Sequence, residues 1–139
     1  MSVYNGNIKI TTKSENDIVD ITDDVQEIVS KSKLEQGICN IFIPGSTGTI
    51  STIEFEPGLK HDFPRILENI APKNQEYKHH GTWNDDNGRS HCKATLMGSS
   101  LTLPFNNGRI IHGTWQQIVF IELDTRPRNR NIIVQLVGE

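Results

Sequence analysis

The residues best suited to chemistry lie together in one short stretch, HHGTWNDDNGRSHC, at 79–92. The stretch holds three histidines and the adjacent pair Asp85 and Asp86, with almost no apolar side chain except Trp83. Histidine exchanges protons near neutral pH, and carboxylates supply the hard oxygen ligands that Mg²⁺ takes beside a substrate phosphate. A polar surface loop explains the same composition, and clusters of this kind often turn out to be false matches. The residues alone therefore favour a loop over an active site.

A second segment, PGSTGT at 44–49, directly follows a predicted strand. Its backbone N–H groups and the hydroxyls of Ser46 and Thr47 can cradle an oxyanion. The spacing and the lysine of a phosphate-binding P-loop are missing, however. A plain tight turn is the simpler interpretation of the spacing.

A third segment, RPRNR at 126–130, carries three arginines at alternate positions. Pro127 holds the segment extended, so Arg126, Arg128 and Arg130 are predicted to point to one side, and guanidinium suits bidentate contact with phosphate. Two alternatives are an edge strand protected by charge and a simple ion pair between one arginine and Glu122. No nucleophile–base motif and no zinc-binding cysteine spacing occurs.

The charge distribution supports an anionic ligand in the second half of the chain. The 139 residues carry a formal net charge of -3, which argues against a general nucleic-acid binder. Residues 1–37 hold four lysines against seven acids, whereas residues 87–139 hold six basic residues against three acids. No signal peptide and no apolar run long enough to cross a membrane is present. Cys39 and Cys92 lie in apolar runs and lack disulfide or metal spacing, so we expect a cytoplasmic protein.

The helices and strands that must position these residues do not alternate regularly along the sequence. Helices are predicted to begin at Thr22, which can cap the first, and at Asp62. Strand patterns cover 7–12, 38–44, 50–56, 92–98, 100–105, 109–111, 114–123 and 131–137. The strand at 38–44 is so apolar that both of its faces should be covered. Two helices among about eight strands predict one α+β domain over residues 1–139, with a mixed or mostly antiparallel sheet.

Several motifs spread along the chain resemble the YjbQ-like family, whose members are called secondary thiamine-phosphate synthase enzymes. They are Y-x-H (Tyr77, His79), the Asp85-Asp86 pair, S-H-x-K (Ser90, His91, Lys93), L-M-G-S-S-L-T-L-P (96–104), G-T-W-Q (113–116) and I-I-V-Q-L-x-G-E (132–139). The resemblance implies an α+β domain and a homotrimer with pockets near subunit boundaries. It also implies a transferase reaction in which a pyrimidine pyrophosphate joins a thiazole phosphate and pyrophosphate is released.

The resemblance implies a set of site residues, and the chain differs from the family motif at one position. The implied site comprises Glu54, Asp62, His79, Asp85, Asp86, His91, Gln116 and Glu122, with Arg128 and Arg130 as phosphate contacts. Many members have a histidine in an H-T-[ST]-A motif where this chain has Gly45. A divalent metal, Mg or Zn, held by His79 and His91 therefore needs a third ligand from elsewhere, such as a hydroxyl, Glu54 or His80.

Two function classes follow from these observations. The first is an enzyme acting on a phosphorylated small molecule, in which Asp85 and Asp86 hold a cation on a pyrophosphate and the histidines bind metal or act as acid and base. The second is a non-catalytic homotrimer that sequesters a metal or a phosphorylated metabolite. A third possibility is that the polar residues serve only a trimer interface.

Overall fold

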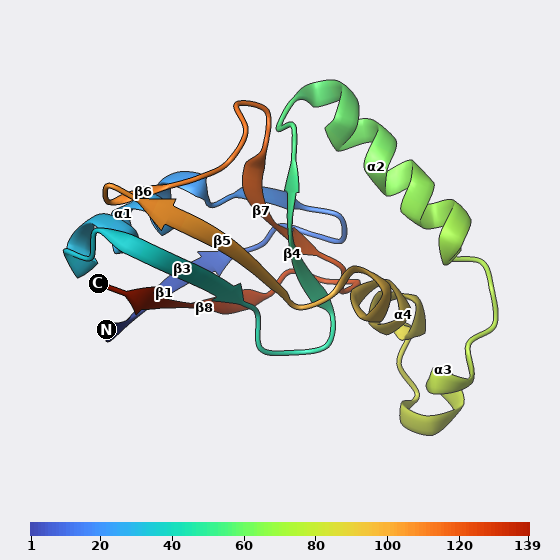
Figure 1. The fold of residues 1–139 in the computed structure, drawn as a ribbon. Helices are drawn as coiled ribbons and strands as arrows, with labels where there is room; N and C mark the ends of the chain where they lie inside the picture. The colour runs from blue at the N-terminus through green and yellow to red at the C-terminus, as the bar shows by residue number, and fades with distance from the viewer.

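Eight strands and four helices form one α+β domain, which confirms the predicted fold class (Figure 1). The structure is a computed structural model that describes all residues, 1–139. The strands are β1 (Ser2–Thr11), β2 (Ile18–Asp20), β3 (Gln36–Phe42), β4 (Gly48–Ile53), β5 (Ser100–Asn106), β6 (Arg109–Ile110), β7 (Gln117–Glu122) and β8 (Asn129–Gly138). The helices are α1 (Thr22–Ser32), α2 (Pro57–Ile70), α3 (Lys78–Trp83) and α4 (Gly88–Met97).

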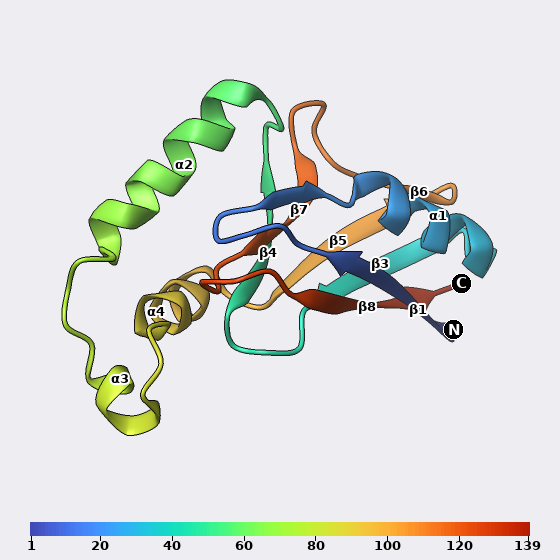
Figure 2. The same cartoon turned by 180° about the vertical axis from the view of Figure 1, so that it is seen from behind.

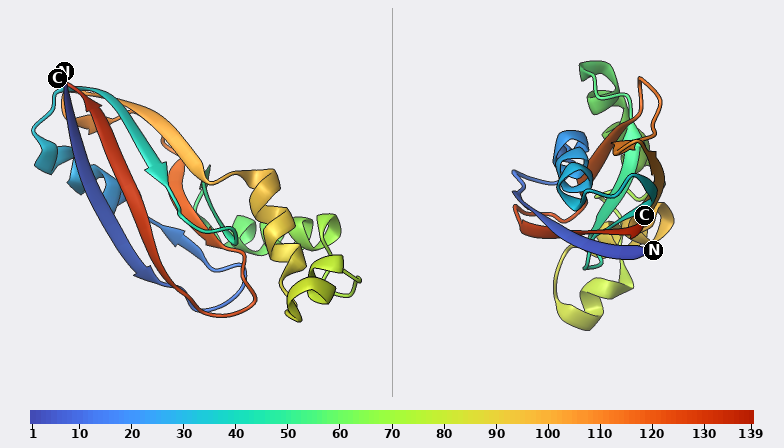
Figure 3. Two further views of the ribbon diagram at one scale, coloured as in Figure 1. Left: turned by 90° about the horizontal axis from the view of Figure 1, so that it is seen from below. Right: turned by 60° about the vertical axis from the view of Figure 1, so that its left-hand side comes forward.

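The strands form two sheets, and every pair is antiparallel. The large sheet has the order β1-β8-β3-β5-β6, and the small sheet has the order β2-β7-β4. β8 therefore lies inside the large sheet, between β1 and β3. Helices α2, α3 and α4 gather at the end of the sheets opposite α1 (Figure 3).

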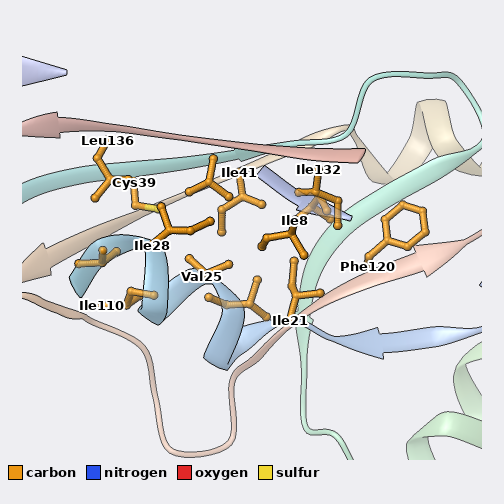
Figure 4. Packing of buried hydrophobic residues seen from close by; sticks show 14 of the residues in the cluster. Ile8, Ile21, Val25, Ile28, Cys39, Ile41, Ile110, Phe120, Ile132 and Leu136 are labelled. Atoms are coloured by element: carbon orange, nitrogen blue, oxygen red, sulfur yellow. The ribbon is translucent and has the colours of Figure 1, made fainter. Parts of the chain in front are cut away.

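The main core lies between α1 and the large sheet (Figure 4). Val25, Ile28 and Val29 recur at helical spacing and are buried against Ile41 and Ile132, as the pattern predicted. Full burial of each such side chain contributes roughly 1.5–3 kcal/mol. Thr22 is not the cap of this helix, because the capping position is occupied by Ile21, without a side-chain cap.

The outer face of β3 is open, contrary to the prediction that both of its faces are covered. Cys39 and Ile41 are fully buried, but Ile38 and Phe42 are 51% and 38% exposed. The reason is that α1 covers one face of the large sheet and no helix of the same chain covers the other (Figure 2). Burial raises the pKa of the Cys39 thiol to about 12, so this cysteine is an inert part of the core.

Three local predictions in the middle of the chain were wrong. The predicted strand at 92–98 is helix α4, and α3 within the polar stretch was not predicted at all. Helix α2 begins at Pro57 and not at Asp62, because the Glu56 carboxylate accepts hydrogen bonds from the N–H groups of its first turn.

Candidate functional site

Helices α3 and α4 bring His79, Asp85 and His91 together. The Nε2 atom of His79 lies 3.1 Å from Oδ1 of Asp85, and the rings of His79 and His91 have centroids 4.5 Å apart. Asn84 ends α3 in the left-handed region, with φ of 56°, and turns the chain toward α4. The first residue of α4 is Gly88, where an added Cβ would lie only 2.7 Å from Cβ of Tyr77. Glycine at this position therefore permits the two helices to touch.

The contact between His79 and Asp85 is close but does not form a hydrogen bond. The two facing atoms, Nε2 and Oδ1, are buried and are not aligned for a hydrogen bond. A ring nitrogen of His80 also makes a short contact with the backbone carbonyl of Asp85. A histidine close to both a carboxylate and a second histidine ring can hold or exchange a proton, which is the chemistry of a general acid or base.

The two adjacent aspartates face different partners. Asp85 faces His79, whereas Asp86 accepts a hydrogen bond of 3.3 Å from the hydroxyl of Thr125. No group of three or more His, Cys, Asp or Glu side chains in the chain is arranged to hold a metal ion. A metal on His79 and His91 stays a prediction, and within one chain it has no third protein ligand of these types.

A charged network lies behind this cluster, where β7 ends and β8 begins. Arg130 donates to both carboxylate oxygens of Glu122, with Nε 2.9 Å from Oε1, and the Glu122 side chain is fully buried. Arg128 donates from Nε and Nη2 to Oδ2 of Asp124, at 2.9 and 2.6 Å. The ion-pair interpretation of Glu122 and the arginine-rich turn is therefore correct. β8 is an interior strand over Ile133–Gly138, but its arginine-bearing end pairs only with β1, so the edge-strand interpretation stays open there.

Asp124 is held in its charged form by this network. Burial alone would raise the pKa of Asp124, but hydrogen bonds from the Thr125 N–H, Arg128 and Asn87 outweigh it and bring the pKa below the usual 3.8. The hydroxyl of Thr47 donates to Asp124 at 3.2 Å and accepts from Arg130 at 2.9 Å. Thr47 is thus occupied within the chain.

Sequence analysis missed a second buried charge cluster, which lies under α4. Arg89 donates from Nε and Nη2 to the two carboxylate oxygens of Glu15, at 3.1 and 2.7 Å, and this hydrogen bonding raises the pKa of Arg89. Lys93, one turn further along, is 1% exposed, lies 3.7 Å from Glu15 and has no hydrogen-bond partner at Nζ. Arg89 also donates to the carbonyl of Asp86 at 2.9 Å, so it fixes the turn that carries Asp85.

The residues carried over from the resemblance divide into two groups within one chain. Gln116 and Glu54 flank the pair Ile53 and Gln117, at one end of the small sheet, whereas Glu122 pairs with Gly48 at the other end. A strand of this length separates the two ends by about 16 Å. Asp62 lies on α2 beside the first group, with Ile53 lining the same groove. Glu54, Asp62 and Gln116 therefore do not join His79, Asp85 and His91 in a single chain.

A cavity of about 470 Å³ lies between α3, α4 and the segment before α3, and Asp85 lines it whereas His79 and His91 do not. Its charged and titratable lining residues are Lys73, Glu76, Tyr77, Lys78, His80, Asp85, Asp86 and Arg89. Gly88 also lines the cavity, so the N-terminal end of α4 faces it, and that end carries a partial positive charge.

Gly45, which replaces the histidine of the resembled motif, has a backbone that a histidine would rarely adopt. Its φ of 113° lies in a region that L side chains avoid. A histidine at position 45 would therefore be strained in this loop, and the side chain nearest to the place of its Cβ is that of Arg130, with Nη1 at 3.4 Å.

Comparison with known proteins places the chain in a family. The UPF0047 protein YjbQ-like family model matches residues 6–139. A UPF0047 protein of Methanothermobacter thermautotrophicus is 38% identical over all of this chain and 95% of its own length, and YugU of Bacillus subtilis is 30% identical over 94% and 97%.

Solved structures agree with this placement. A YbjQ-like protein of unknown function, SSO2532 from Sulfolobus solfataricus, superposes with a TM-score of 0.94 at 37% identity over 99% of both chains. Hypothetical protein APE1520 from Aeropyrum pernix superposes with a TM-score of 0.90 at 28% identity, over 97% of this chain and 98% of its own. No helix of the chain is long and apolar enough to cross a bilayer. The chain belongs to the YjbQ-like UPF0047 family, whose function is unknown.

Proposed function

We propose that the chain is an enzyme that performs acid–base chemistry on a phosphorylated small molecule. The observation that carries the proposal is the contact of His79 with Asp85 at 3.1 Å and with the ring of His91 at 4.5 Å. Of these three groups Asp85 lines a cavity of about 470 Å³, which is large enough for a metabolite.

The roles follow from the contacts. Asp85 lies 3.1 Å from Nε2 of His79, and its carboxylate would stabilise a positive charge on the ring during proton transfer. In its protonated form either histidine can donate to a leaving phosphate oxygen. Arg89 is bound by Glu15, so its part is to hold the Asp86 carbonyl and thereby the turn that presents Asp85.

The cavity suits a phosphate at its cationic side. Lys73 and Lys78 are exposed and free to contact a ligand, and the N-terminal end of α4 adds the field of its backbone N–H groups. Glu76, Asp85 and Asp86 balance these charges, so a divalent cation that arrives with a pyrophosphate would find carboxylate oxygens at the same place. Mg²⁺ bound in this way would neutralise the leaving pyrophosphate.

The specific reaction to test is thiamine phosphate synthesis, which the family resemblance suggests. In that reaction the thiazole nitrogen attacks the methylene carbon of the pyrimidine, and the carbon–oxygen bond to pyrophosphate breaks. The step needs charge neutralisation and no protein nucleophile, which agrees with a site of histidines, lysines and carboxylates.

A non-catalytic homotrimer that binds a phosphorylated metabolite or a metal is the alternative. One observation favours it: the separation of Glu54 and Gln116 from the histidine pair within one chain leaves the residues of the implied site dispersed. The exposed apolar side chains of Ile38 and Phe42 on the open face of the large sheet are consistent with self-association.

Thiamine phosphate formation by the purified protein with Mg²⁺ tests the proposal. We expect product from the wild type and a large loss in Asp85→Asn and in His91→Ala. His112→Ala is the matched control, because His112 lies on the β6–β7 connection and is hydrogen-bonded only to its neighbour Gly113. Equal rates in wild type, Asp85→Asn and His91→Ala would refute the acid–base roles. Saturable stabilisation by pyrophosphate without any product would support the binding alternative.

A further inference from the structure

A second hollow lies at the other end of α4, against the loop that contains Gly45. It has a volume of about 260 Å³. Its lining residues are Gly45, Ser46, Gly48, Ala94, Thr95, Gly98 and Ser99. None of them is acidic, and three of them carry hydroxyls. Thr95 lies one helical turn after His91, so the hollow and the histidine pair share one side of α4.

A nearly buried guanidinium, that of Arg130, approaches Gly45 without lining the hollow itself. Arg130 is 10% exposed at its side chain, and its Nε and Nη2 are bound by Glu122 and Thr47. Its remaining nitrogen, Nη1, makes no hydrogen bond within the chain and keeps contact with solvent. Nη1 lies 3.4 Å from the position that a Cβ of Gly45 would occupy. The guanidinium is therefore held rigidly with one donor turned toward the loop.

The loop itself adds unpaired backbone donors. The N–H groups of Gly45, Ser46 and Thr47 donate no hydrogen bond within the chain. Gly45 and Ser46 are exposed, and the hydroxyl of Ser46 also has no partner. Because Gly45 has no side chain, a ligand atom can approach Nη1 and these N–H groups together.

We infer that this hollow, called here the Gly45 hollow and lined by the seven residues named above, is an oxyanion-binding subsite that takes a phosphate group. Arg130 Nη1, the Gly45 and Ser46 N–H groups and the hydroxyls of Ser46 and Thr95 supply the donors, and successive backbone donors of this kind bind anions in proteins. The choice of phosphate rests on the proposed function; the existence of an oxyanion subsite does not. With the α3–α4 cavity, the subsite places two anion sites on either side of His91.

Binding of inorganic phosphate and pyrophosphate to ¹⁵N-labelled protein, followed by amide chemical shifts, tests the subsite. Saturable shifts are expected at Gly45 and Ser46. Thr95→Asp puts a carboxylate into the hollow on an exposed position of α4 and should weaken binding at least about tenfold through like-charge repulsion. Leu96→Asp is the matched control, because it adds the same charge to the next residue outside the hollow and should leave the affinity within about twofold.

The subsite and the proposed reaction can fail separately. Saturable shifts at Gly45 and Ser46 that persist in His91→Ala support the subsite even where no thiamine phosphate forms. The absence of such shifts, or equal affinity in wild type and Thr95→Asp, overturns the subsite even where the reaction proceeds. Shifts confined to Lys73–Gly81 would also overturn it and would place the phosphate in the α3–α4 cavity instead.

Discussion

Replacing Lys93 by methionine is expected to stabilise the protein, although Lys93 is almost completely buried. The Nζ atom has no hydrogen-bond partner and lies 3.7 Å from a carboxylate of Glu15 whose two oxygens already accept from Arg89. Removing the ammonium therefore leaves no acceptor without a donor. Methionine fills a similar length with atoms that need no partner.

The magnitude follows from three opposing terms. The attraction between Lys93 and Glu15 at 3.7 Å amounts to about 4 kcal/mol at an effective dielectric constant of about 20. Desolvation of a buried ion costs several kcal/mol, and the neighbouring guanidinium of Arg89 repels the ammonium. Desolvation and repulsion together exceed the attraction, and we take the net cost to be that of an unsatisfied buried polar group, about 1–3 kcal/mol. We expect Lys93→Met to raise the free energy of unfolding by about 1–2 kcal/mol.

Arg89→Met, one turn earlier on the same helix, should have the opposite effect. It leaves both Glu15 oxygens and the Asp86 carbonyl without donors, and breaking a buried ion pair in this way costs about 3–5 kcal/mol. Urea unfolding followed by circular dichroism at neutral pH measures both variants. A loss of more than about 1 kcal/mol in Lys93→Met would refute the reasoning, because it would mean that Nζ is well partnered in solution.

Three further predictions concern the charged network and the Gly45 loop. Glu122→Gln leaves the buried guanidinium of Arg130 without its counter-charge and should cost about 3–5 kcal/mol in urea unfolding; a change below about 1 kcal/mol would contradict a buried pair. The pKa of Asp124 is lowered on folding, so its stabilising contribution is complete above about pH 4 and is lost as the pH falls further, and Asp124→Asn should flatten the acid side of the melting-temperature profile. Gly45→His should cost about 1–2 kcal/mol because of the φ of 113°, and an unchanged melting temperature would show that the loop relaxes freely.

The apolar pattern of the sequence correctly predicted several elements in the first and last parts of the chain. Alternation in β1 and β8 and the helical spacing of Val25 and Ile28 identified their elements, because one face of each is buried against the core. The residues of the polar stretch alone favoured a surface loop, and the pairing of His79 with His91 came only from the family resemblance; the structure places their ring centroids 4.5 Å apart.

The pattern failed at α4 for a physical reason. Periodicity methods look for an apolar stripe, but the buried face of α4 is made of Arg89, Ser90 and Lys93, which recur at helical spacing as polar groups. Cys92 and Leu96, which suggested a strand, are exposed. The partner of this face, Glu15, is 74 residues away from Arg89 along the chain, so no local pattern could reveal it. Helices whose buried face is polar are therefore found from the structure and not from apolar periodicity.

The pairing of Glu122 with Arg130 also constrains how the family can evolve. The two residues lie on β7 and β8, in different sheets, and either one alone would be a buried charge without a partner. A single substitution at either position passes through a destabilised intermediate, so accepted changes should come as coordinated pairs. An alignment of many relatives should therefore show positions 122 and 130 covarying. Glu122 and Arg130, which link the two sheets, would then be kept together or replaced together during evolution.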